Sequence, residues 1–222
     1  MTVRRFLRTG TPYLLCAAVL AGAAIEFFKE YSLVFFLRGT TNQQIEQLAA
    51  IEEALPLPAS SKTSRDLLVT CAKVVLEAPL LKADEKLNRL VRFNCARFAR
   101  SVLSSAPLSG RARATLLLME RTVDDAVQLA MAQTTAPNEP VPLQIRLAAY
   151  TSYGSPPSTT RELIVRDFER AAETWWGRQA VARIYVSVPA FRDVIVEAGR
   201  NLKAEKQADL VKVVRRAAGE QN

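Results

Sequence analysis

The residues of this chain that offer chemistry are basic side chains, two tryptophans and three cysteines. The sequence has 222 residues, of which 30 are Lys or Arg and none is histidine. Without histidine there is no Ser-His-Asp triad, no Cys-His pair and no HExxH zinc site. The cysteines form no CxxC pair and, without histidine, make a poor zinc site. We therefore predict no catalytic residue, no cofactor and no metal ligand, so the remaining chemistry is that of binding.

Four cations recur along one predicted helix, over residues 83–104. They are Lys86, Arg89, Arg97 and Arg100, and a rotation of about 100° per residue places them on one face. Such a stripe predicts binding of an anionic polymer or of lipid headgroups, although most charged helix faces are simply solvated. The net charge of +8 is too diffuse along the chain to favour nucleic acid as a partner.

The two tryptophans are adjacent and therefore point about 100° apart on a helix. Ile164, Phe168 and Ala171 precede Trp175 at helical spacing, which predicts that Trp175 is buried. Trp176 then lies at the edge of the helix, where it either covers a neighbouring helix or anchors a partner. Trp176 joins the four cations as the candidate partner or ligand surface.

Cys71 and Cys95 lie on consecutive predicted helices. If these helices fold back at the segment PLLKAD, the two cysteines are offset by one turn, or about 5 Å. A disulfide needs closer register and an oxidising compartment. We favour two buried free thiols, with a disulfide as the alternative.

The chain after Gly39 is predicted to be all-α, because Ala, Leu and Arg are frequent and only eight glycines occur. Helices are expected over 41–55, 64–77, 83–104, 109–131 and 143–150, from Thr160 onward, and through the last third. Thr41 and Gln44 have capping-box spacing, and Thr160 is a predicted cap. ARIYVSV, residues 182–188, is the one candidate strand. Acidic and basic residues alternate over 161–170, which predicts a solvated, ion-paired face.

The N-terminal segment combines a basic leader, containing Arg4, Arg5 and Arg8, with an uncharged apolar run over 12–25. It is either a signal cleaved near AGAA or an uncleaved anchor that continues to Leu37. A buried first helix of a cytosolic bundle is a third alternative. We favour the anchor because more apolar chain follows the run than a mature N-terminus usually carries. Its arginines then place the N-terminus in the cytoplasm.

Proline-containing joints at Pro79, Pro107 and Pro137 recur at spacings of 28 and 30 residues. Repeats of this size are typical of stacked helix pairs, and an irregular bundle is the alternative. The predicted organisation is a basic cytoplasmic leader (1–11), a transmembrane signal anchor (12–37), a helical-hairpin region (38–150) and a C-terminal helical region packed on it (151–222).

The segment AVQLAMAQTTAPNEPVPLQIRLAA, residues 126–149, resembles the second helix, proline turn and following helix of tetratricopeptide-like repeats. APNE followed by Leu143 and Arg146 is similar to small membrane-anchored helical proteins found with bacterial polysaccharide-export and polymerisation systems. The resemblance implies a scaffold or accessory subunit and transfers no catalytic residue.

These observations together predict a non-enzymatic, membrane-anchored scaffold of the bacterial cell envelope. It would span the inner membrane once, hold its C-terminal domain in the periplasm and bind a partner protein of the membrane or envelope, in the setting of polysaccharide assembly that the resemblance implies. The alternative is a cleaved, soluble periplasmic helical module that binds an anionic polymer.

Overall fold

The computed structural model describes residues 3–51, 58 and 60–219, without the side chains of residues 3–15 and 29. Within these ranges every regular element is a helix, so the predicted all-α class is confirmed. The arginine side chains of the leader, that of Lys29, and the end of the first predicted helix before Pro56 lie outside the described residues.

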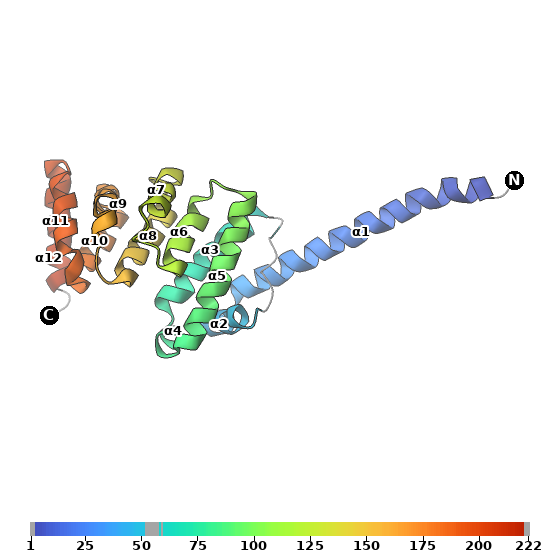
Figure 1. Ribbon diagram of the computed structural model, residues 1–222, viewed down its shortest axis with the longest axis horizontal. Coiled ribbons are helices and arrows are strands. Elements are labelled where there is room, and N and C mark those ends of the chain that lie inside the picture. Colours follow the sequence, from blue (N-terminus) through green and yellow to red (C-terminus); the bar gives the residue numbers. More distant parts are fainter. Residues whose placement is uncertain (1–2, 52–57, 59, 220–222) are drawn as a thin grey trace.

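The elements follow one another along the chain as labelled in Figure 1. They are α1 (Val3–Arg38), α2 (Thr41–Ala49), α3 (Ser61–Glu77), α4 (Pro79–Ala83), α5 (Glu85–Ser105), α6 (Gly110–Glu120), α7 (Ala126–Thr135), α8 (Pro140–Tyr153), η1 (Ser158–Thr160), α9 (Arg161–Glu173), α10 (Trp175–Ser187), η2 (Pro189–Phe191), α11 (Arg192–Arg200) and α12 (Ala204–Gly219).

Helices that are close in sequence are also neighbours in space. α3 packs on α5, α5 on α6, α6 on α8, α9 on α11 and α10 on α12. The helices are therefore arranged roughly in chain order along the long axis, with α1 at one end and α11 and α12 at the other (Figure 1). One continuous core of buried Leu, Val, Ala and Phe runs through this stack.

Polar side chains before the helices supply most of the caps. The backbone N–H of Leu87 donates to Asp84 Oδ1 at 2.9 Å at the start of α5. The predicted capping box exists one residue earlier than expected, with Thr40 as the cap and Gln43 as its partner. Two adjacent threonines offer the same chemistry, and the local backbone of Thr40, which is extended, decides between them.

The helix expected over 109–131 is in fact two helices, α6 and α7. Arg121 ends α6 in the left-handed conformation, at φ 55°. Asp125 then caps α7 by accepting hydrogen bonds from the backbone N–H groups of Val127 and Gln128. The break rotates the second half, so that Val127, which one continuous helix would place four residues after the buried Val123 on the same face, is exposed.

Two further local predictions are wrong. The segment ARIYVSV is not a strand: residues 182–187 form the end of α10, where Ala182 is buried and Ile184 packs on the core. Thr160 stands at the start of α9 without capping it. Its hydroxyl donates instead to the Val123 carbonyl at 2.8 Å and holds the α6–α7 connection against α9.

α1 extends away from the helical stack (Figure 1). Its C-terminal part packs on α2 and α3 through the buried side chains of Leu33 and Phe36. The amide Nε2 of Gln44 donates to the carbonyls of Phe36 and Leu37, and the Thr63 hydroxyl donates to the Glu30 carboxylate. Among the described residues, no helix is long and apolar enough to cross a membrane.

Candidate binding surfaces

The part of α1 beyond the stack has no covering from the rest of the chain. Every described side chain from Cys16 to Phe28 is exposed. Large apolar groups are among them: Leu20 is 70% exposed and Phe28 is 66% exposed. Soluble monomers rarely expose a continuous apolar surface of this kind. None of the other described residues covers this part of α1.

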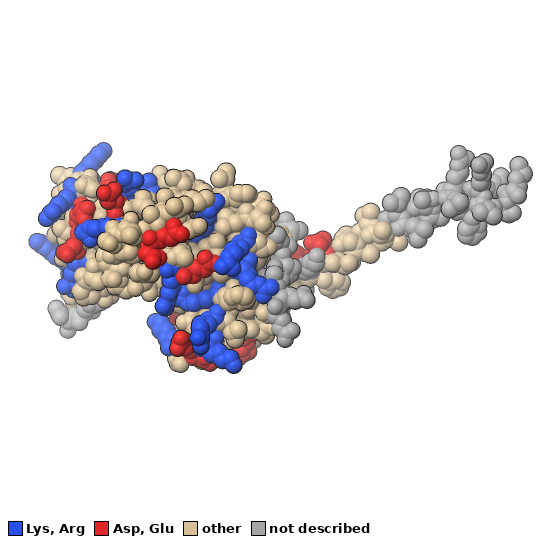
Figure 2. All heavy atoms as spheres, viewed as in Figure 1, with Lys and Arg blue, Asp and Glu red and all other residues tan. Residues whose placement is uncertain are grey.

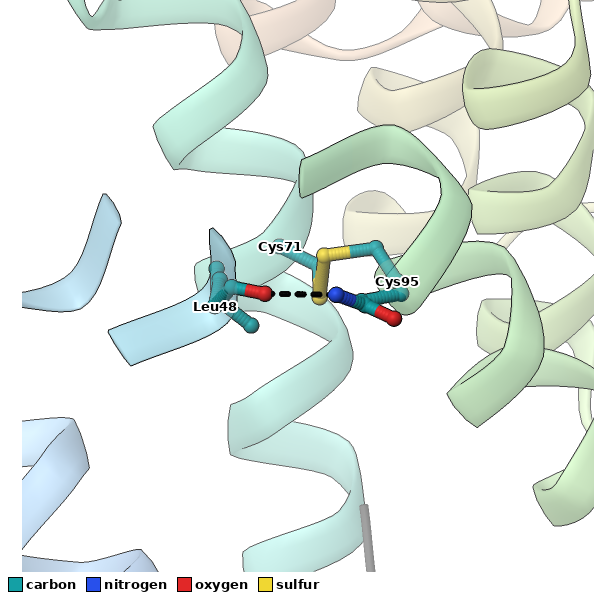
Figure 3. The surroundings of a disulfide bond; sticks show 4 residues. Leu48, Cys71 and Cys95 are labelled. Atoms are coloured by element: carbon teal, nitrogen blue, oxygen red, sulfur yellow. Dashed lines mark hydrogen bonds between the residues drawn. A yellow bond between two sulfur atoms is a disulfide. The ribbon is translucent and has the colours of Figure 1, made fainter. Parts of the chain in front are cut away.

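Cys71 of α3 and Cys95 of α5 form a disulfide with a Cα–Cα distance of 5.8 Å (Figure 3). The favoured prediction of two free thiols is wrong. It assumed that α3 folds back directly onto α5, whereas the short helix α4 lies between them and changes the register. Both cysteines are fully buried in the core.

Asn94, next to the disulfide, ties α2 to α5. Its side-chain amide donates to the Leu48 carbonyl at 2.7 Å and to the Ile51 carbonyl at 3.2 Å. These carbonyls lie at the C-terminal end of α2, where the helix leaves them without intrahelical donors. Because α2 in turn holds α1, the disulfide and Asn94 together fix the base of the projecting helix.

A buried polar cluster joins α7, α8 and α9. The Arg146 guanidinium binds Asp167 through both oxygens, at 2.6 and 3.1 Å, and its Nη1 donates to the carbonyls of Ala132 and Ala136 at 3.2 Å. The Tyr150 hydroxyl donates to Asp167 at 2.5 Å. Asp167 was predicted on a solvated face; the structure places it at 0% exposure.

The environment of this cluster keeps Arg146 charged and Tyr150 neutral. Burial, together with the adjacent charge of Asp167, raises the pKa of Tyr150 well above its ordinary value. Burial alone lowers the pKa of Arg146, but the hydrogen bonds and charge of Asp167 outweigh it and the pKa is raised. The groups of the cluster bind one another, so we assign it to holding three helices together.

The predicted cationic stripe lies on the outer face of α5, where Figure 2 shows basic side chains gathered. Lys86 and Arg89 are exposed and Arg97 is half-buried. Arg97 lies over the ring of Phe93, with its guanidinium carbon 5.5 Å from the ring centre. Phe93 is 57% exposed and was missed from the sequence, although its spacing of four residues from Arg89 and Arg97 places it between them.

One cation of the stripe, Arg100, and two cations beside it bind within the chain. Arg100 forms an ion pair with Glu120 of α6. Arg113 donates to the Pro107 carbonyl at 2.8 Å, and Arg92 donates to the Leu118 carbonyl at 2.6 Å. The surface available to a partner is therefore narrower than the stripe predicted from sequence. We call it the α5 face, defined as Lys86, Arg89, Leu90, Phe93 and Arg97.

The two tryptophans have the reverse of the predicted orientation. Trp175 is 71% exposed, whereas Trp176 is half-buried and packs on the core. The prediction assumed one helix from Ile164 to Trp175, but α9 ends at Glu173 and the Thr174 hydroxyl caps a new helix by accepting from the Gly177 N–H. The new helix has its own axis, so the earlier spacing does not carry across the break.

No group of His, Cys, Asp or Glu side chains that could hold a metal ion occurs within the described ranges. The features that remain are surfaces: the apolar part of α1, the α5 face and the tryptophan pair. No protein-family model, curated protein or solved structure matches this chain.

Proposed function

We propose that the protein is a membrane-anchored, non-enzymatic scaffold of the bacterial cell envelope, with its helical stack outside the cytoplasm. The observation that carries the proposal is the bare apolar surface of α1. Lipid would cover the side chains from Cys16 to Phe28, which the stack leaves exposed. The proposed span, 12–37, rests on the sequence of the whole stretch, of which the described side chains begin at Cys16.

The Cys71–Cys95 disulfide supports the extracytoplasmic location of the stack. Disulfides form and persist in oxidising compartments such as the periplasm and are rare in the cytoplasm. The basic leader, with Arg4, Arg5 and Arg8, favours the matching orientation, because basic residues stay on the cytoplasmic side. Two independent features therefore support the proposed location and topology.

The partner surface that we propose is the α5 face. It combines exposed apolar side chains, Leu90 and Phe93, with flanking cations. Aromatic and arginine side chains contribute strongly at protein interfaces. Anchoring would confine this surface beside a membrane or envelope protein, which strengthens a weak contact by raising its effective concentration. The resemblance of residues 126–149 adds two points to this proposal. The stack would consist of tetratricopeptide-like helical hairpins, and the protein would act in polysaccharide assembly.

A topology reporter tests the anchor. The full chain carries a C-terminal enzyme that is active only outside the cytoplasm, and we expect it to be active and to sediment with membranes. Val19→Lys/Leu20→Lys should release the chain from membranes, because each lysine costs about 3 kcal/mol within the hydrocarbon core. Thr41→Lys/Asn42→Lys, which adds the same charge at exposed positions of α2, is the matched control. A reporter active only in the cytosol would contradict the proposal.

A further inference from the structure

The tryptophan pair lies in a groove between α8, α10 and α12, at the end of the stack far from α1. The groove has a volume of about 510 Å³ and is lined by Trp175, Trp176, Gln144, Gln179, Arg183 and Arg216, with Val213 and Ala217. This volume is within the range of ligand sites, roughly 300 to 1,000 Å³. The site contains a large aromatic surface and a few polar side chains, which is the usual make-up of a site for a small organic group.

Both arginines of the groove lack a counter-charge among the residues that the structure describes. Arg183 and Arg216 have no ion pair with any described residue. None of the described residues that line the groove carries a carboxylate. Two guanidinium groups beside one groove favour an anion between them, and the planar guanidinium matches a carboxylate through two hydrogen bonds.

The rest of the groove suits a sugar better than a peptide. The indole of Trp175 is exposed, and its electron-rich face can cover the C–H face of a pyranose ring. The side-chain amides of Gln144 and Gln179 can both donate to and accept from neighbouring hydroxyls. The lining residues other than Trp175 and Trp176 lie inside helices, whose backbone groups already bond to one another, so an extended peptide would find backbone donors only at the start of α10.

We infer that this groove binds an acidic sugar, with the indoles against the ring and the arginines on a carboxylate. The groove would give the stack a site for a uronic-acid glycan, separate from the α5 face. This inference does not depend on membrane attachment. The groove could fail to bind an acidic sugar in a membrane-anchored scaffold, and it could bind one in a chain that is not anchored.

The test uses the fluorescence of the full chain in detergent micelles. The chain contains only two tryptophans, and both line the groove, so a change in emission reports this site directly. The probes are tetramers of galacturonic, glucuronic and mannuronic acid, each beside the neutral tetramer of the parent sugar. We expect a saturable change with at least one acidic tetramer and a weaker one with its neutral counterpart.

Variants separate the parts of the site. Trp175→Ala should weaken binding about tenfold or more, as for aromatic anchors elsewhere, while Trp176 still reports. Arg183→Gln/Arg216→Gln should remove the preference for the acidic tetramer over the neutral one. Lys62→Gln/Lys73→Gln, which removes the same charge from exposed positions of α3 outside both proposed surfaces, should leave affinity unchanged.

Three results would overturn the inference. One is that none of the three acidic tetramers gives a saturable change. Another is that Arg183→Gln/Arg216→Gln binds them as the parent chain does. The third is that a tetramer of glutamate binds as tightly as the best acidic sugar, which would assign the groove to acidic peptides instead.

Discussion

At the scale of single residues, the most consequential contact is between Arg146 and Asp167. Both side chains are at 0% exposure, and their two hydrogen bonds cross from α8 to α9. Burying a charge is tolerable only when a partner compensates for it. The Tyr150 hydroxyl, two backbone carbonyls and Arg170, 3.5 Å from Asp167, complete the shell, so the loss of Arg146 removes the only fully buried charge partner of Asp167 among the described residues.

We predict that Arg146→Met lowers the free energy of unfolding by about 3 to 5 kcal/mol, because the fully buried Asp167 carboxylate loses both hydrogen bonds from its buried charge partner and keeps only the Tyr150 hydroxyl and the partly exposed Arg170, at 3.5 Å. Urea denaturation followed by circular dichroism measures this loss. The double variant Arg146→Met/Asp167→Leu should recover part of it, since no unpaired charge remains.

The control for this prediction is the exposed ion pair between Arg161 and Glu197, whose side chains are 40% and 46% exposed. Arg161→Met should cost less than about 1 kcal/mol, because solvent screens such pairs. If Arg146→Met and Arg161→Met lower the free energy of unfolding equally, the buried cluster stabilises the fold no more than an exposed ion pair does.

At the scale of elements, a chain of contacts through α5, α3 and α2 fixes the C-terminal part of α1 to the stack. α3 and α5 are joined by the disulfide, Asn94 of α5 binds the end of α2, and the side-chain amide of Gln44 in α2 binds the end of α1. Each link joins a helix end to a neighbour that is itself held. The base of the projecting helix is therefore fixed by covalent and hydrogen-bonded contacts as well as by apolar packing.

We predict that removing the disulfide lowers the free energy of unfolding by about 3 kcal/mol, the value expected for a closed loop of this length. The loop spans a sequence separation of 24 residues. Cys71→Ala/Cys95→Ala is compared in urea with Cys16→Ala, which removes the exposed cysteine only. If both variants unfold at the parent chain's urea concentration, the disulfide contributes nothing to stability.

At the scale of the whole molecule, the two ends of the stack carry different surfaces. α1 leaves one end, and the tryptophan groove lies at the other, beside α12 (Figure 1). If α1 is embedded in a membrane, the groove faces away from it and the α5 face lies nearer to it. This arrangement suits a protein that holds one partner close to the bilayer and another ligand farther from it.

The mass of the chain recovered from cells distinguishes an anchor from a cleaved signal. We predict an intact Met1–Asn222 chain in the detergent fraction, because the docked part of α1, with Leu33 and Phe36, continues directly from the apolar stretch. Mass spectrometry of the purified chain measures this. Cleavage after AGAA would instead give a soluble species that lacks every residue up to Ala24, and would favour the diffusing periplasmic module.

The sequence by itself determined the helical class and most helix faces. Val91, Cys95, Phe98 and Val102 are buried as their spacing predicts, because periodicity within one helix depends only on local geometry. The positions of the cationic stripe on one face of α5 follow from the same rule. The same rule places Phe93 between Arg89 and Arg97 on this face, so its position could also have been predicted from the sequence.

Only the tertiary structure decided what happens between helices. The short α4 sets the register that brings Cys71 to Cys95, and the break at Thr174 decides which tryptophan is exposed. Asp167 is buried because Arg146, 21 residues away, lies opposite it. Helix breaks and packing partners depend on residues far apart in the chain, and a spacing rule within one helix carries no information about them.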